Sequence, residues 1–358
     1  MSLVRPMGRA VLVGLAAAIV ASACGNTGSG TSPVGSGSLT GAGATFPAPF
    51  YQKAFFTYSQ QYPAVTINYQ SVGSGAGIQQ FIKGTVEFGA SDVPMGSADI
   101  TSAGGPDTLT QIPATLGVIS IAYNLSGVSK LQLDGSTLAN IYLGHIKKWN
   151  DAALVALNPG VALPNTEIQV VHRSDSSGTS YHFTDYLGKV SPEWKTKVGV
   201  AKAVSWPAGI GGNGNQGVAQ AVQSTAGAIG YVELAYVVSA NMTQAFLKNK
   251  NGKFVQASVD GATAAAAQNT SVSPTNFSIT DEPGDTTYPI AGFSWIILHT
   301  SYSDAEKGKA IAYLFKWLVT DGQALGASLQ YAPLPTAVSA LAMTNLKGIK
   351  AAGQVVLT

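Results

Sequence analysis

The chain has 358 residues, enough for two domains that each bury a hydrophobic core. Charged residues make up 11% of the chain and its formal net charge is +2, which argues against a nucleic-acid binder with a broad basic surface. Its 41 glycines are scattered along the sequence, which indicates many tight turns rather than a low-complexity chain.

Residues 1–24 have the pattern of an export signal. Two arginines precede an apolar stretch from Ala10 to Ala21, and small residues then lead directly to Cys24. This arrangement resembles a bacterial lipoprotein signal, in which the cysteine is lipidated, for example with palmitate, and becomes the new N-terminus. Ordinary signal-peptide cleavage beside an incidental cysteine is the alternative. Because Cys24 is the only cysteine of the chain, it cannot form an internal disulfide.

The segment 25–38, GNTGSGTSPVGSGS, has the composition of a flexible tether. We therefore expect the fold to begin near Leu39. With the preceding signal, this predicts a chain held at the cell membrane by a lipid anchor, on its extracytoplasmic face.

The first predicted helix follows a turn that contains Thr45. Tyr51, Phe55 and Tyr58 are spaced to lie on one face of a helix, and Pro47 suits its first turn, where a missing N–H costs nothing. The hydroxyl of Thr45 is therefore expected near the helix N-terminus, where it can cap the helix or bind a ligand.

Two further turns follow along the chain. The alternation of Val65, Ile67 and Tyr69 predicts a strand, and the small residues 71–77, including Ser74, lead from it into a predicted helix. Residues 88–94 form a short apolar approach that ends in an acidic turn at Asp92. Alone, Asp92 is more typical of a turn or helix cap than of a binding site.

The segment 173–180, RSDSSGTS, lies between a predicted strand at 168–171 and a helix whose apolar face includes Phe183 and Tyr186. A Ser/Gly/Thr turn that opens a helix offers backbone N–H groups, hydroxyl donors and the positive end of the helix dipole to an anion. Arg173 adds a planar cation suited to phosphate or carboxylate oxygens. An ordinary capped helix with a surface salt bridge is the alternative for this segment alone.

Repeated strand–turn–helix units predict an α/β fold with ligands at the carboxyl ends of the strands. The four turns, at 41–46, 71–77, 89–92 and 173–179, are far apart in the sequence. A single ligand that touches all of them would therefore have to lie between two structural units.

Together, the motifs GAGATFPAPFY, SVGSGAG, FGASDVP and RSDSSGTSYHF resemble the phosphate-binding protein family, the substrate-binding lipoproteins of the bacterial high-affinity phosphate ABC transporter. The resemblance extends through IYLGHIKKWND, WPAGIGGNGNQGV and GAIGYVE. It implies a periplasmic-binding-protein fold (type II-like) with two discontinuous lobes joined by a hinge. Lobe I would comprise residues 39–113 plus 286–358, and lobe II residues 116–283.

The same resemblance implies a receptor, not an enzyme, that delivers inorganic phosphate to an ABC permease with a cytoplasmic ATPase. It would need no cofactor or metal, bind no nucleic acid, and be a monomer before docking. Phosphate would be bound by hydroxyls, backbone N–H groups, one guanidinium and one carboxylate, from Thr45, Phe46, Ser74, Asp92, Arg173, Ser177, Gly178 and Thr179. Asp175 would pair with Arg173.

Asp92 would supply the selectivity of such a site. Phosphate at neutral pH keeps a proton that it can donate, whereas sulfate does not. An ionised Asp92 can only accept a hydrogen bond. A site built to accept a hydrogen bond from its ligand can reject an analogue that lacks this donor by about 10⁴- to 10⁵-fold.

A phosphatase or other hydrolase is the main alternative, since the same turns could hold a phosphoryl group. It would need a metal cluster or an activated nucleophile. His145, His172, His182 and His299 have no metal-ligand spacing, so we expect each at the surface or in the core.

A dinucleotide enzyme and a surface adhesin are the remaining alternatives. Residues 209–214, GIGGNG, match the dinucleotide pattern with Glu233 beyond them, but Trp206 and Pro207 interrupt the approach, so we expect a structural loop. An adhesin has no positive support in the sequence, which lacks repeats.

Overall fold

The computed structural model describes residues 33–358. The predicted signal peptide, Cys24 and residues 25–32 of the predicted tether lie outside these described residues. Within residues 33–358, none of the helices is both long and apolar enough to cross a membrane.

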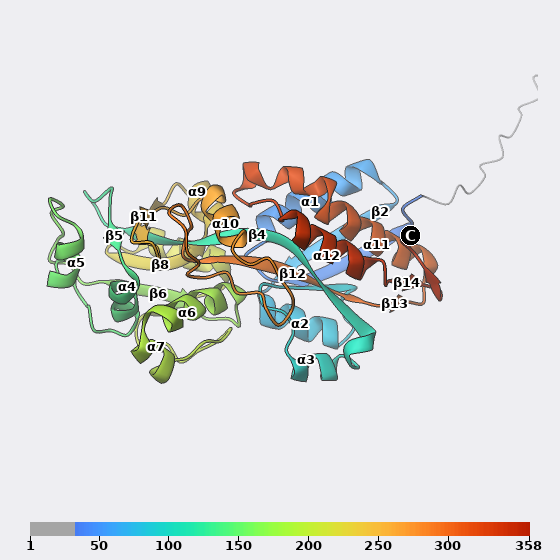
Figure 1. Cartoon of the computed structure of the whole chain (residues 1–358), viewed down its shortest axis with the longest axis horizontal. Helices are drawn as coiled ribbons and strands as arrows, with labels where there is room; N and C mark the ends of the chain where they lie inside the picture. The colour runs from blue at the N-terminus through green and yellow to red at the C-terminus, as the bar shows by residue number, and fades with distance from the viewer. Residues whose placement is uncertain (1–32) are drawn as a thin grey trace, which may run out of the picture. The chain divides into compact units, whose positions relative to one another are not determined.

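A mixed sheet of nine strands organises the described residues (Figure 1). Along its main path the strands are β2 (Val65–Ser71), β1 (Gly37–Gly43), β3 (Phe88–Ser91), β12 (Ala291–His299), β4 (Leu109–Asn124), β8 (Ala228–Glu233), β6 (Gln169–Arg173) and β7 (Ile210–Gly212). The ninth strand, β9 (Thr243–Gln244), pairs with β4. Strands β1, β2 and β3 run parallel, as do β6, β7 and β8, while β12 and β4 are antiparallel to their neighbours.

The long strand β4 joins the two halves of this sheet. Its residues Leu109–Val118 pair with β12, and its residues Ile119–Asn124 pair with β8. The parallel group β1–β3 and the parallel group β6–β8 therefore lie on opposite sides of the antiparallel pair β12–β4.

Twelve α-helices lie around the sheet within residues 33–358. They are α1 (Ala48–Gln61), α2 (Ser74–Ile82), α3 (Ser97–Ser102), α4 (Gly135–Tyr142), α5 (Ala152–Leu157), α6 (Gly178–Val190), α7 (Pro192–Lys197), α8 (Gly214–Ser224), α9 (Leu234–Ser239), α10 (Val259–Ala266), α11 (Ala305–Val319) and α12 (Thr336–Leu346). Short strands form two more sheets, from β5 (Gln132–Leu133), β10 (Phe246–Lys248) and β11 (Phe254–Val255), and from β13 (Ser301–Tyr302), β14 (Lys350–Ala351) and β15 (Gln354–Val355).

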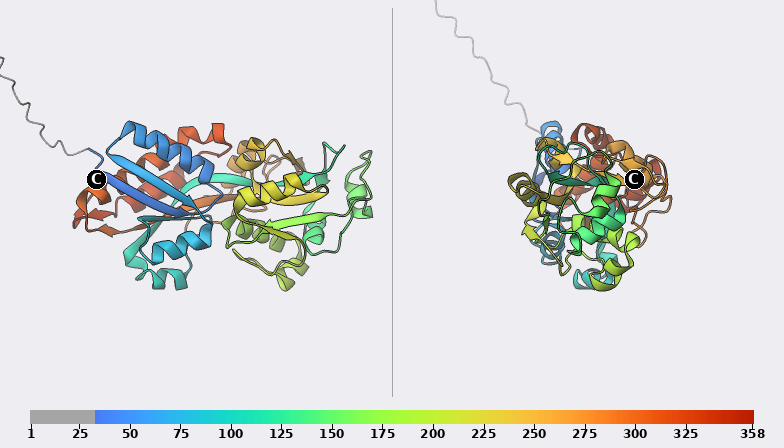
Figure 2. Two further views of the ribbon diagram at one scale, coloured as in Figure 1. Left: turned by 180° about the vertical axis from the view of Figure 1, so that it is seen from behind. Right: turned by 90° about the vertical axis from the view of Figure 1, so that its left-hand side faces the viewer.

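The helices cover both faces of the sheet. Figures 1 and 2 show α1, α11 and α12 on one side of the β1–β3 group and α2 and α3 on the other. Alternation along β8 separates two apolar clusters in the same way, because Ala228 and Val232 pack with α8, while Ile229 and Tyr231 belong to the main core with Phe183 of α6. The expected α/β fold is confirmed.

The predicted helix with Tyr51, Phe55 and Tyr58 appears as α1. The strand predicted at 65–69 and the helix after it appear as β2 and α2, and the strand predicted at 168–171 and the helix after it appear as β6 and α6. The expected start of the fold near Leu39 is too late. Strand β1 begins at Gly37, whose backbone pairs with Val65, and the side chain of Val34 is buried. A Gly/Ser-rich segment can still join a sheet, because the ladder bonds come from the backbone rather than from side chains.

Candidate functional site

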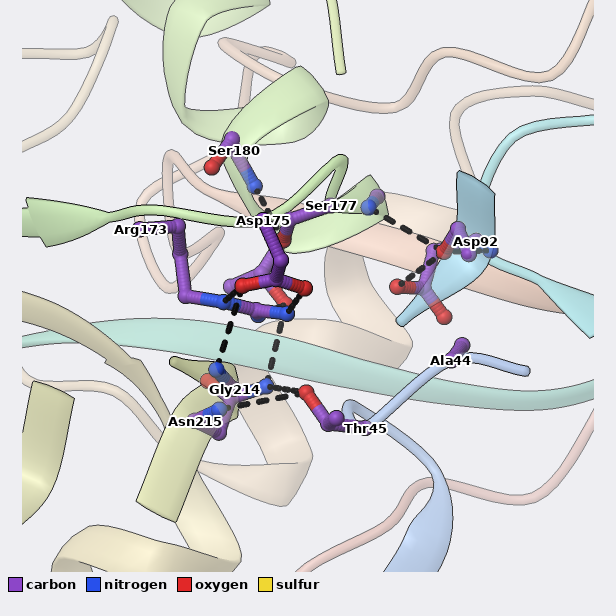
Figure 3. A network of polar contacts seen from close by, with 12 residues as sticks. Ala44, Thr45, Asp92, Arg173, Asp175, Ser177, Ser180, Gly214 and Asn215 are labelled. Carbon is purple, nitrogen blue, oxygen red and sulfur yellow. Dashed lines mark hydrogen bonds and ion pairs between the residues drawn. The ribbon is translucent and has the colours of Figure 1, made fainter. Parts of the chain in front are cut away.

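The predicted ligand residues come together where several strands end and helices begin (Figure 3). Thr45 follows β1, Asp92 follows β3, Ser74 is the first residue of α2, and Arg173 is the last of β6. All are buried, with at most 2% of any of these four side chains exposed. The carboxyl ends of the two groups of parallel strands thus face one site, as expected for α/β folds.

Ser74 connects the turns that follow the β1–β3 group of strands with the turn that follows β6. Its Oγ accepts hydrogen bonds from the backbone N–H of Gly178, at 3.1 Å, and of Asp92, at 3.3 Å. The same hydroxyl is 3.4 Å from Asp92 Oδ2, to which it donates. Gly178 must be glycine here, because a Cβ would lie 2.4 Å from Cβ of Asp92.

Asp92 is a buried carboxylate held by hydroxyl donors. Besides Ser74, Ser294 on β12 donates from Oγ to Asp92 Oδ1 at 2.8 Å. Burial raises the pKa of Asp92 to about 7, against the smaller lowering effects of the Ser294 hydrogen bond and the Arg173 charge. Ionised Asp92 can accept a further hydrogen bond from a ligand that carries a proton.

Arg173 is held by Asp175 through two parallel hydrogen bonds. Its Nε lies 2.7 Å from Asp175 Oδ1, and its Nη2 contacts Oδ2, which is the bidentate geometry of strong guanidinium–carboxylate pairs. Although burial alone would raise the pKa of Asp175, the hydrogen bonds and charge of Arg173 hold that pKa below its usual value. Gly214 N–H also donates to Asp175, at 3.1 Å. The predicted pairing is present, and it offsets most of the arginine charge.

The N-terminus of α6 supplies the backbone donors. Ser177 is its N-cap and accepts the Ser180 N–H at 3.1 Å, so the Ser177 hydroxyl keeps its own proton to donate. Thr179 is in the first turn, and its Oγ1 accepts from Arg173 Nη1 at 3.2 Å. Together with the helix dipole, these groups offer hydrogen-bond donors of the kind that suit an anion.

The site also contains residues for which sequence reasoning gave no role. Asn215, in the first turn of α8, donates to the hydroxyls of Thr45 and Thr179 (Figure 3). The hydroxyls of Tyr236 and Tyr331 donate to the backbone carbonyls of Thr45 and Phe46, both at 2.6 Å. Tyr231 accepts the Arg173 N–H at 2.9 Å, and Ser294 contacts Asp92 as described above.

The signal for Asn215 was present in the glycine run 209–214. The sequence predicts a structural loop there, but the segment forms β7 and opens α8. The expectation was wrong because the run has the same strand–turn–helix order as the segments around Ser74 and Arg173. The aromatic contacts and Ser294 had no such local signal.

The histidines have the surroundings expected from the sequence. His145 is exposed beside Glu193, His172 stacks on Trp206 with ring centroids 4.8 Å apart, and His299 lies near Phe81. His182 is buried, and burial lowers its pKa to about 4.

Comparisons with known proteins identify the family of this chain. A family model described as the PBP superfamily domain matches residues 27–321. The chain therefore belongs to the PBP superfamily.

Individual relatives identify the family within this superfamily. The chain is 44% identical over 304 residues to the phosphate-binding protein PstS of Xylella fastidiosa, covering 83% of this chain and 81% of that protein. It is 45% identical over 304 residues to PstS of Pasteurella multocida, covering 84% of this chain and 87% of that protein. The chain belongs to the PstS family of phosphate-binding proteins.

Solved structures share the fold at lower sequence identity. A high-affinity periplasmic phosphate-binding protein (PfluDING) with bound phosphate superimposes with a TM-score of 0.72 at 22% identity, covering 88% of this chain and 99% of that chain. A putative phosphate ABC transporter substrate-binding protein from Clostridium perfringens gives 0.62 at 18% identity, covering 84% and 100%. At these identities the likeness shows the fold alone.

Proposed function

We propose that this protein is an extracytoplasmic receptor that binds inorganic phosphate and delivers it to an ABC permease for import. The observation that carries this proposal is that an acceptor and several donors are buried in one place. Asp92 is the acceptor, and Arg173 and the N-terminus of α6 supply the donors (Figure 3). A protonated oxyanion suits this combination, because it offers acceptor oxygens and one O–H donor to complementary groups. The PstS family is one of binding proteins, and no catalytic step is part of the proposal.

The ligand groups in this proposal are the eight residues predicted from the sequence. Hydroxyls of Thr45, Ser177 and Thr179 would donate to phosphate oxygens, as would Arg173. Backbone N–H groups of the α6 turn and of Phe46 would add further donors. The Gly178 N–H now bonded to Ser74 would exchange that partner for a phosphate oxygen.

The cancellation of the Arg173 charge by Asp175 also fits this function. A bare guanidinium would attract any anion, whereas a neutralised one leaves directional hydrogen bonds to decide which anion binds. Sulfate, which has no proton to donate at neutral pH, would place lone pairs against Asp92.

Calorimetric titration of the purified protein with phosphate tests this function. We expect saturable binding at micromolar phosphate, with sulfate competing at least about 10⁴-fold less well. Absence of phosphate binding, or equal competition by sulfate, would refute the proposal. Turnover of a chromogenic phosphomonoester, with and without divalent metal, would instead indicate the hydrolase alternative.

We further propose that Cys24 carries a lipid anchor and that the receptor is a monomer before it docks to the permease. The small residues before Cys24 and the Gly/Ser-rich segment after it support this anchoring. Mass spectrometry of the mature N-terminus tests the modification, and a Cys24→Ser variant should be released from the membrane fraction. Retention of that variant on membranes would contradict a lipid anchor at this cysteine.

The two-lobe description, with 39–113 plus 286–358 and 116–283 as units, also remains a proposal. It is supported by the path of the chain, which passes between the β1–β3 group and the β6–β8 group at β4 and at residues 283–291. The first group carries Thr45, Ser74 and Asp92, and the second carries the segment that begins at Arg173. Rotation at these crossings would open the buried site to phosphate. Small-angle scattering with and without phosphate should show compaction on binding if the crossings act as a hinge.

A further inference from the structure

Asn215 is a fully buried side chain in the first turn of α8. Its Nδ2 lies 2.9 Å from Thr45 Oγ1 and 3.0 Å from Thr179 Oγ1, and its Oδ1 accepts the backbone N–H of Glu233 at 2.9 Å. One amide group therefore contacts a hydroxyl from the β1–α1 turn, a hydroxyl of α6 and the end of β8. Asn215 thus links Thr45, which follows β1, with Thr179, which lies in the first turn of α6.

The orientation of this amide is fixed by its neighbours. The Glu233 N–H can only donate, so the atom facing it must be the amide oxygen. The amide nitrogen therefore faces the two threonines, and both of its N–H donors are used by them. No other orientation satisfies the buried groups.

The two threonine hydroxyls consequently have both acceptor positions filled. Thr45 Oγ1 accepts from Nδ2 and, at 3.1 Å, from the backbone N–H of Asn215. Thr179 Oγ1 accepts from Nδ2 of Asn215 and from Nη1 of Arg173, at 3.2 Å. Amide and guanidinium nitrogens cannot accept in return. Each hydroxyl is left with a single capacity, the donation of its own proton.

We propose that Asn215 is a positioning residue of the phosphate site, which turns the hydroxyl protons of Thr45 and Thr179 toward the bound anion. This inference rests on the proposed function, in which those hydroxyls are phosphate ligands. A hydroxyl that is free to rotate can present either a proton or a lone pair to a ligand. Asn215 removes that choice before phosphate arrives, so the site is preorganised as a set of donors.

Asn215→Asp is the sharpest test, because it preserves shape and reverses the hydrogen bonding. A carboxylate can only accept, so Thr45 and Thr179 would donate to it and present lone pairs to phosphate. We expect phosphate affinity, measured by calorimetry, to fall by about 100-fold or more. Gln216→Glu is the matched control, since it places the same charge on the next residue at an exposed position. The control should change affinity less than about threefold.

A neutral variant separates proton direction from charge repulsion and from a structural role. Asn215→Ala should weaken phosphate binding by about 10-fold in the wild-type background. In a Thr179→Val background, which lacks one of the two directed hydroxyls, the same change should cost clearly less. An equal cost in both backgrounds would show that Asn215 does not act through Thr179 and would overturn the proposal. This cycle also serves if the Asp variant does not fold.

The outcomes distinguish this inference from the proposed function. If the unaltered protein binds no phosphate, the function itself fails. If it binds phosphate and Asn215→Asp binds equally well, the function stands and the role of Asn215 is refuted. Denaturant unfolding of each variant, without phosphate, shows whether a lost affinity comes with lost stability; a purely structural role would reduce both together.

Discussion

Replacing Asp92 by Asn should make the protein more stable while making it a worse phosphate receptor. Burial raises the pKa of this carboxyl from 3.8 to about 7. One pKa unit corresponds to about 1.4 kcal/mol, so keeping Asp92 ionised in the folded protein costs about 4 kcal/mol at pH 8. Asn carries no charge and removes this cost, although a buried amide N–H without a partner costs about 1–3 kcal/mol.

The pH dependence gives the sign of the effect. The folded protein holds the Asp92 proton more tightly than the unfolded chain does, so the stability that this group contributes is present below pH 4 and lost as the pH rises to about 7. We therefore expect Asp92→Asn to be more stable than the wild type by about 1–3 kcal/mol at pH 8. At pH 4 this advantage should disappear.

The assay is urea unfolding at both pH values in phosphate-free buffer, together with phosphate and sulfate titrations. Asp107→Asn, the same chemical change at an exposed carboxylate, is the matched control and should alter neither property. The ratio of phosphate to sulfate affinity should fall by at least about 100-fold in Asp92→Asn, because Asn can donate to sulfate oxygens. An unchanged ratio, or a variant no more stable than the wild type at pH 8, would refute the reasoning.

Three further variants test the surroundings of the site. Ser177→Ala loses the cap bond to the Ser180 N–H and one ligand hydroxyl, so it should lose about 1 kcal/mol of stability and bind phosphate about 10-fold more weakly; full phosphate affinity would exclude the hydroxyl as a ligand. Asp175→Asn leaves Arg173 without its counter-charge, and we expect sulfate to compete better and phosphate binding to depend more steeply on salt; an unaltered salt dependence would contradict this. Burial lowers the pKa of His182 to about 4, so wild-type stability should fall by about 3 kcal/mol between pH 6.5 and 4 on account of this group. Urea unfolding of His182→Gln should show a shallower acid loss, and an identical loss would mean that His182 is not its source.

Much of the site could be predicted from local sequence. Ser74 and the segment 173–179 each follow a predicted strand and lead into a predicted helix, and Thr45 precedes a predicted helix. Backbone donors at such turns depend only on short-range geometry. The pairing of Asp175 with Arg173 was implied by the family resemblance, and the structure shows their two hydrogen bonds. The repetition of this pattern of turns, and not any single motif, is what predicts an anion site.

Other parts required the folded chain. Ser294 lies 202 positions from Asp92 in the sequence, and Tyr331 lies 285 positions from Phe46, so no local pattern links these pairs. The role of Asn215 depended on the end of β8 meeting α8. The shifted pKa of Asp92 likewise depends on complete burial, which only packing of several distant segments provides.

The sequence by itself determined the α/β class of this protein, its family resemblance and the turns proposed to bind the anion, because these follow from hydrophobic periodicity and from residue chemistry over short spans. Only the tertiary structure decided how those turns share their hydrogen bonds. Ser74 bonds Gly178, and Asn215 bonds both Thr45 and Thr179, across segments brought together by the sheet. The direction of each hydroxyl proton is a property of that whole network, since every buried donor and acceptor must find its partner at once.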